Sequence, residues 1–177
     1  MNDISASIRA QKLIDLHLPR YNEIPRIDLY MDQLINYLEE TLAPLYGPSD
    51  KIITRSMVNN YVKQGVLAAA SGKKYTRTHV AYLIVICTLK QTFSIAEIEN
   101  LIQAQIESFD THIAYDYFCD AFEAALHALF SPQPQSPRGF VSGNNDGDFE
   151  RDLVLACTAA VSYTLYIKAC ITLSLEE

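Results

Sequence analysis

Apolar residues recur at helical spacing along most of the chain, and the breaks between these runs predict six helices. The first run carries its apolar residues on one face: Ile27, Tyr30, Leu34, Leu38 and Leu42. Acidic residues fall between these positions, as expected for an amphipathic helix with one buried stripe. Pro44, Gly47 and Pro48 end this helix. Residues 1–20 have a mixed pattern, and we expect them to be poorly ordered or loosely docked.

A short second helix is predicted between Thr54 and Gly65. Thr54 is a suitable N-cap, and Gly65 is suited to end the helix at its C′ position. One face carries three apolar residues, Val58, Tyr61 and Val62, and the Tyr61 ring should face the core beside Val58. Residues 66–71, followed by Gly72 and the segment 73–75, predict a short extended hairpin whose turn contains the glycine.

Two helices should follow this hairpin. Thr76 or Thr78 begins the first of them, which is dense in apolar residues. Ser94 and Glu97 form a capping box, in which each side chain can satisfy a backbone N–H group of the other residue. A helix therefore starts at Ser94 and continues through Ile102. The pattern up to this point is helix, helix, hairpin, helix, helix.

The C-terminal region is predicted to be helical as well. Residues 109–130 are amphipathic, residues 131–148 form a flexible loop rich in proline and glycine, and Phe149 to Leu175 form the last helix. This helix is apolar nearly all round, so it must be buried on most sides. The amphipathic helix can cover only one stripe of it. We therefore expect contacts with a second subunit too, giving a homodimer or a cavity for a small-molecule effector that the sequence does not identify.

Three bulk properties limit where the protein works. Lys168 and several hydroxyl residues interrupt the last apolar segment, so we expect a buried or interface helix and no membrane partner. The four cysteines lie far apart, without the spacing of a zinc site or a disulfide framework. Residues 1–21 lack the pattern of a signal peptide. These features predict a protein of the reducing cytoplasm.

Charge is strongly segregated along the chain. Residues 51–96 contain seven Lys or Arg residues and no Asp or Glu, whereas the other seven bases share the rest of the chain with all 21 acids. A window of charge +7 thus lies in a protein of net charge −7. A basic surface on an acidic protein is typical of binding to a polyanion, most commonly nucleic acid.

A short helix followed by a lysine-bearing hairpin is the arrangement of a winged helix-turn-helix. Such a helix fits the major groove of DNA, and the hairpin places cations on the neighbouring phosphates. The polar face of the helix carries candidate base and phosphate contacts: Arg55, Ser56, Asn59, Asn60 and Lys63. The hairpin and the following helix start add further candidates: Lys73, Lys74, Tyr75 and Arg77. The alternative is an ordinary solvated face, which a charge run usually is, but the long absence of acids makes this less favoured.

Three segments follow one another in a characteristic order: VNNYVKQGVL (58–67), GKKYTR (72–77) and FSIAEI (93–98). In this order they resemble the DNA-binding domain of MerR-type regulators. From about Leu18 to Ile102, through IDLYMDQ (27–33) and VAYLIVIC (80–87), the chain is also similar to an uncharacterised bacterial family, a domain of unknown function described as MerR-like transcriptional regulators. The resemblance implies a winged helix-turn-helix that binds double-stranded DNA and controls transcription.

Other kinds of site find less support in the sequence. His112, Asp116 and Asp120 are spaced by four on a helix and could share a metal, but no fourth ligand is evident. The segment 144–148 is similar to a calcium loop, yet the required carboxylate at its twelfth position is Leu153. No nucleotide-binding or nucleophile motif occurs. We therefore expect no metal, no cofactor and no enzymatic activity.

Together these observations predict an all-α fold with a small β wing. An N-terminal segment (1–26) precedes a MerR-like winged helix-turn-helix (27–104), and a helical dimerisation or effector region follows (105–177). The expected function is sequence-specific DNA binding for transcriptional control, with a homodimer as the binding species, because one short helix reads few base pairs. The alternative is a protein-interaction module that keeps this fold and docks an acidic protein partner.

Overall fold

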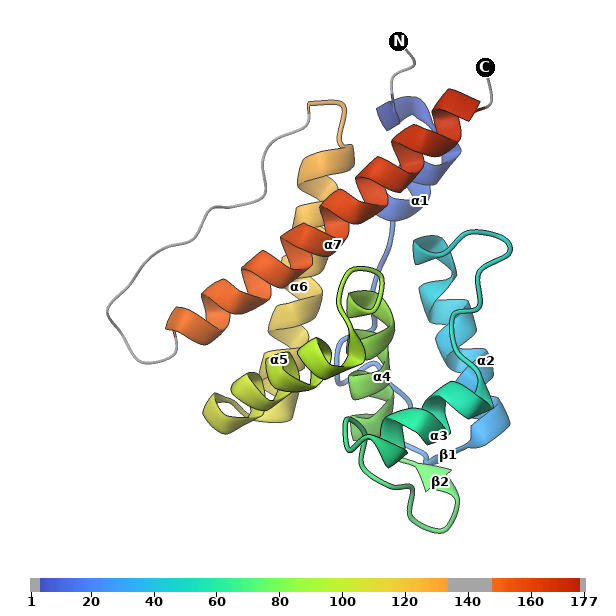
Figure 1. The fold of residues 1–177 in the computed structure, drawn as a ribbon, viewed down its shortest axis with the longest axis vertical. Helices are drawn as coiled ribbons and strands as arrows, with labels where there is room; N and C mark the ends of the chain where they lie inside the picture. Colours follow the sequence, from blue (N-terminus) through green and yellow to red (C-terminus); the bar gives the residue numbers. More distant parts are fainter. Residues whose placement is uncertain (1–3, 134–147, 176–177) are drawn as a thin grey trace. The chain divides into compact units, whose positions relative to one another are not determined.

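The computed structural model describes residues 4–133 and 148–175, which are mostly helical with one small antiparallel sheet (Figure 1). This confirms the predicted all-α class with a small β component. The chain forms two compact units. One consists of Leu18–Tyr117, and the other combines Met1–His17 with Phe118–Glu177. These boundaries differ from the domains expected at 27 and 105, because the N-terminal helix belongs with the C-terminal region.

The Leu18–Tyr117 unit contains the predicted helices and the sheet. Its elements in chain order are β1 (Leu29–Tyr30), α2 (Met31–Leu42), the 3-10 turn η2 (Ala43–Leu45), α3 (Arg55–Lys63), β2 (Lys74–Tyr75), α4 (Arg77–Leu89), α5 (Ile95–Ser108) and the start of α6 (Thr111–Phe130). Leu34, Leu38 and Leu42 form the buried face of α2, as their spacing predicts. Helix α4 is buried at most positions and forms the centre of this core.

The first predicted helix starts later than the apolar spacing suggests. Ile27 and Tyr30 are exposed, and Leu29 is buried between them. The Tyr30 backbone is extended, and its N–H donates to Gln33 Oε1 at 3.0 Å, which caps α2. Residues 29 and 30 therefore form a strand with alternating burial, and two apolar residues matched the helical period by coincidence.

The predicted hairpin is only partly correct. Ser71 and Lys74 form an antiparallel bridge around a tight turn, but β2 pairs with β1 in the register Leu29 with Tyr75. Residues 66–71 do not form the second strand. Val66 and Leu67 are buried, and their N–H groups both donate to Tyr61 O, so they close helix α3 instead. The sheet thus joins two segments about 45 residues apart, a pairing that local pattern does not reveal.

The second unit contains η1 (Ile4–Ala6), α1 (Ile8–Ile14), the C-terminal part of α6 and α7 (Asp148–Leu175). For residues 4–20 the expectation of poor order or loose docking is wrong, since Ser7 caps α1 through Ala10 N and Leu13 is buried; residues 1–3 lie outside the described residues. Helix α7 crosses α6, where the rings of Phe130 and Tyr166 meet edge to face at 5.5 Å (Figure 1). Most of the predicted loop 131–148 lies outside the described residues.

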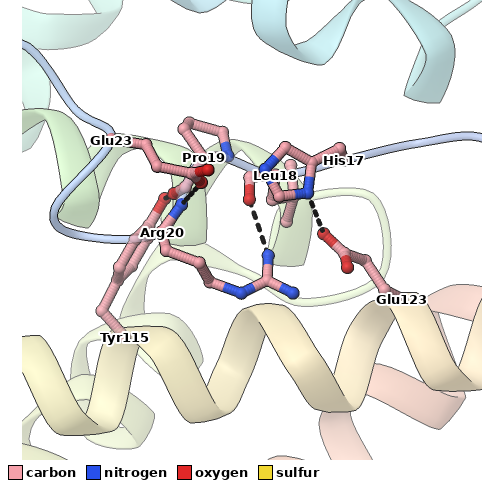
Figure 2. Close-up of polar contacts among 7 residues, drawn as sticks. All are labelled: His17, Leu18, Pro19, Arg20, Glu23, Tyr115 and Glu123. Carbon is pink, nitrogen blue, oxygen red and sulfur yellow. Dashed lines mark hydrogen bonds and ion pairs between the residues drawn. The ribbon is translucent and has the colours of Figure 1, made fainter.

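The chain passes from one unit to the other after His17, and polar contacts hold it on both sides of this point (Figure 2). In the second unit, His17 Nδ1 lies 3.6 Å from Glu123 Oε1. In the other, Tyr115 donates its hydroxyl hydrogen to Pro19 O at 2.7 Å, and Arg20 Nη1 donates to Leu18 O at 2.6 Å. The hydrogen bonds that the backbone carbonyls of Leu18 and Pro19 accept thus hold the segment after His17 in place.

Candidate nucleic-acid interface

Helix α3 begins and ends where the sequence predicts. Thr54 Oγ1 accepts a hydrogen bond from Met57 N at 3.2 Å, and Gly65 follows the helix with a φ of 82°, a conformation that favours glycine. Val58 and Tyr61 are buried, and burial raises the pKa of the Tyr61 hydroxyl to about 12. The opposite face is exposed at every predicted contact position: Arg55, Ser56, Asn59, Asn60 and Lys63. The helix therefore presents its polar side chains to solvent.

A tight basic turn formed by Ser71–Lys74 provides the second group of cations. Gly72 and Lys73 have φ values of 57° and 62°, the signature of a type I′ turn, and Lys74 N donates to Ser71 O at 3.0 Å. Lys73 and Lys74 are exposed. The ammonium group of Lys74 lies 5.2 Å from the centre of the Tyr30 ring, a cation–π contact that holds it beside β1.

A series of contacts connects the basic turn to α3. Lys74 pairs with Tyr30 across the sheet, and α2 starts directly after Tyr30. Asp32, in the first turn of α2, accepts a hydrogen bond from Arg55 Nη2 at 2.5 Å. The N-terminal end of α3 therefore lies at the same end of the unit as the basic turn (Figure 1). Both side chains of this ion pair are largely exposed, so water and salt weaken it.

Two of the predicted contact residues belong to the scaffold. Tyr75 is buried, its ring stands edge to face on His79 at 5.6 Å, and burial raises the pKa of its hydroxyl. The guanidinium of Arg77 lies 5.3 Å from the centre of the Tyr21 ring, and its Nε and Nη2 are shielded from solvent. The expectation that both residues face DNA is therefore corrected, because β2 and the start of α4 direct them inward.

A second base of residues 51–96, which we call the acid-free window, is also engaged inside the unit. Lys90 Nζ donates to Ile52 O and lies 5.5 Å from the centre of the Tyr46 ring. Tyr46 in turn donates its hydroxyl hydrogen to Cys87 O at 2.5 Å. Five of the seven bases remain exposed: Lys51, Arg55, Lys63, Lys73 and Lys74. The exposed charge is thus smaller than the sequence count, and it is concentrated on α3 and the basic turn.

The residues weighed as metal ligands have other contacts. Asp116 Oδ1 accepts a hydrogen bond from Tyr21 N at 2.7 Å, and the His112 ring lies 6.2 Å from the Tyr21 ring. Within residues 4–133 and 148–175, no group of three or more His, Cys, Asp or Glu side chains could hold a metal ion. Cys87, Cys119 and Cys157 are buried, and Cys170 is exposed.

Residues 19–119 match a family described as Domain of unknown function (DUF1836). The chain belongs to the DUF1836 family. This confirms the expected uncharacterised family, whereas its MerR-like regulatory nature stays a prediction. No curated protein and no solved structure matches the chain. The DUF1836 match coincides almost completely with the Leu18–Tyr117 unit, so the candidate interface lies within the family domain and α7 lies outside it.

Sequence reasoning missed two residues of this interface, Asp32 and Tyr30. Asp32 lies outside the acid-free window, and only the pairing of β1 with β2 places it beside Arg55. Tyr30 was assigned to the apolar face of a helix, but its exposed ring supports Lys74. An aromatic residue next to a basic turn could have indicated this contact, had the strand been recognised.

Proposed function

We propose that the DUF1836 domain of this chain is a sequence-specific DNA-binding module of a transcriptional regulator, with the winged-helix mode of binding that the MerR-like resemblance implies. Helix α3 enters the major groove, and the basic turn contacts the neighbouring phosphates. The observation that carries the proposal is the position of exposed Asn59 and Asn60 between cations, on a helix joined through Asp32 and Tyr30 to Lys73 and Lys74. A DNA target implies the cytoplasm.

The exposed residues of α3 have the chemistry that base reading requires. Asn59 and Asn60 lie three and four positions after Ser56, and Lys63 lies three positions after Asn60, so the four residues line one side of the helix. Asparagine can form two hydrogen bonds with the edge of adenine, and lysine can pair with guanine or phosphate. The stripe from Ser56 to Lys63 is about 10 Å long, the length of about three base pairs.

The basic turn supplies affinity more than sequence preference. Phosphate contacts depend on charge and tolerate loose geometry, which suits the exposed side chains of Lys73 and Lys74. Because α3 alone reads so few base pairs, useful specificity needs two copies of the domain on two half-sites. The proposal therefore includes a homodimer as the DNA-binding species.

The decisive experiment is selection of bound sequences from a random pool of double-stranded DNA with the full chain. We expect one enriched motif with two related halves. The double variant Lys73→Ala/Lys74→Ala should lose binding to every pool member, while Lys12→Ala, which removes an exposed lysine from α1, should not. Absence of any enriched motif, or equal binding by the double variant, would contradict the proposal.

One observation favours a second candidate, a module that docks an acidic protein partner. A carboxylate, that of Asp32, already contacts Arg55, so the surface accepts protein carboxylates. Both candidates predict binding that weakens with salt. Only the DNA candidate predicts an enriched sequence, and only the protein candidate predicts that a polyglutamate peptide binds as tightly as selected DNA.

A further inference from the structure

Helix α7 has two faces with different surroundings. One face is buried within its own unit and consists of seven residues: Val154, Cys157, Thr158, Val161, Ser162, Leu165 and Ala169. The other carries large apolar side chains in solvent, with exposed fractions of 71% at Phe149, 41% at Tyr163, 56% at Ile167 and 54% at Ile171. Side chains of this kind are rarely left together on the surface of a monomer.

Five exposed residues and three half-buried ones follow a seven-residue repeat, which we call the apolar stripe. Its spacings of four and three are those of a helix that packs along another helix: Phe149, Leu153, Ala156, Ala160, Tyr163, Ile167, Cys170 and Ser174. The stripe extends along about 38 Å of the helix. The repeat is continuous from one end of α7 to the other, so the face suits a long partner helix.

Small and large residues are unevenly distributed along the apolar stripe. Ala156 and Ala160 lie in its N-terminal half, and Tyr163 and Ile167 lie in its C-terminal half. We propose that the chain forms a homodimer in which two α7 helices pack antiparallel through this stripe, around a two-fold axis between residues 161 and 162. Tyr163 then packs on the partner's Ala160, and Ile167 on the partner's Ala156. Large side chains facing small ones fill such an interface, whereas parallel packing would place alanine on alanine and leave a void.

The ends of the helix favour the same orientation. Phe149 at one end of the stripe faces the partner's Ser174 at the other, and Leu153 faces the partner's Cys170. In this register a large side chain again lies opposite a smaller one at each end of the stripe.

The available area is sufficient for a dimer. The exposed parts of the stripe and of Ile171 amount to about 600 Å² per subunit, or about 1,200 Å² in total, the lower end of the range for stable interfaces. Phe149–Ser174 is also long and apolar enough to cross a membrane. A bilayer would have to replace the packing of its buried face, however, whereas a second copy covers only the exposed stripe.

Cysteine cross-linking tests the orientation. In the antiparallel dimer the two copies of the exposed Cys170 are about 25 Å apart along the axis, too far for a disulfide. We expect mild oxidation to leave the wild-type chain unlinked and to link Leu153→Cys through the partner's Cys170. Arg151→Cys, which places a thiol off the stripe, is the matched control and should stay unlinked. A disulfide-linked wild type would establish a parallel pair and overturn the proposal.

Light scattering tests whether the apolar stripe is the dimer interface. The wild type should have twice the monomer mass at micromolar concentration, and Ile167→Glu should be a folded monomer by circular dichroism. Thr172→Glu adds the same charge at an exposed position off the stripe and should remain a dimer. A monomeric wild type, or a dimeric Ile167→Glu, would exclude the stripe as the interface. Wild type that sediments with phosphatidylglycerol vesicles, when Ile167→Glu does not, would assign the stripe to a lipid surface and overturn the proposal.

Discussion

Helices α3 and α7 both bury one face in their own unit, but their exposed faces have opposite chemistry. The exposed face of α3 carries amides and cations next to the basic turn, whereas that of α7 is an apolar stripe. A polar face binds through charge and hydrogen bonds, so its affinity falls with salt. An apolar stripe binds through area and shape, and salt weakens it little. Each helix thus has a chemical preference for a different class of partner.

The largest expected effects concern what the two helices share, their buried faces. Tyr61→Ala in α3 and Leu165→Ala in α7 should each lower the free energy of unfolding by about 3 kcal/mol, because each removes a packed side chain and leaves a cavity. Urea denaturation followed by circular dichroism measures both. Lys63→Ala, on the exposed face of α3, should change it by less than about 0.5 kcal/mol. Full stability of Tyr61→Ala would show that the assigned faces of α3 are reversed.

The next effects test whether α3 recognises bases or binds DNA only through its charge. Asn59→Ala and Asn60→Ala should each reduce the preference for the selected sequence by about 1–3 kcal/mol and leave binding to unrelated DNA nearly unchanged. Competition binding with selected and scrambled duplexes gives this difference. Asn36→Ala removes an exposed amide from α2 and should have no effect. If the preference survives both α3 substitutions, α3 is not the reading helix.

Smaller effects distinguish the bases of the acid-free window that face solvent from those that pack inside the unit. Lys73→Ala and Lys74→Ala should each make the plot of log affinity against log salt less steep by about 0.9. Arg77→Ala should leave the slope unchanged and lower the melting temperature, because its guanidinium packs on Tyr21. The same salt series should not dissociate the α7 dimer. A slope change in Arg77→Ala, without loss of stability, would return that residue to the interface.

The smallest effect concerns Asp32, the acid beside the candidate interface. Asp32→Asn releases Arg55 from its ion pair and removes a negative charge beside this proposed DNA contact. DNA affinity should rise by about two- to fivefold, in keeping with the modest strength of exposed ion pairs. Glu39→Gln, a charge removal elsewhere on α2, is the control. Tighter binding of an acidic peptide, without tighter binding of DNA, would favour the protein-docking alternative.

Helix ends could be predicted because they depend on nearby residues. Thr54, Ser94 and Gly65 act on groups within four residues in the chain, and the structure confirms all three. Thr76, one of two predicted helix starts, caps α4 together with His79. The apolar period likewise identified the buried faces of α2 and α3. Such features need only the local sequence, because the hydrogen bonds and the helical period are themselves local.

The direction of individual charged side chains could not be predicted in the same way. Lys73 and Lys74 point outward, but Arg77 and Lys90 are held by Tyr21 and by Ile52 O, partners that lie 56 and 38 positions earlier. A count of charges along the chain treats all four alike. Whether a base can meet DNA depends on which aromatic ring or carbonyl the fold brings beside it.

By itself the sequence determined the helices from α2 onward, the ends of α3 and the start of α5, the absence of acids in residues 51–96 and the apolar character of α7. Only the tertiary structure decided that β2 pairs with β1, that Asp32 meets Arg55 and that α1 docks with the C-terminal unit. These contacts join residues far apart in the chain, and no local period or capping pattern specifies them. They form because burying the remaining apolar surface offsets the entropy lost in closing long loops, and this balance depends on the whole chain at once.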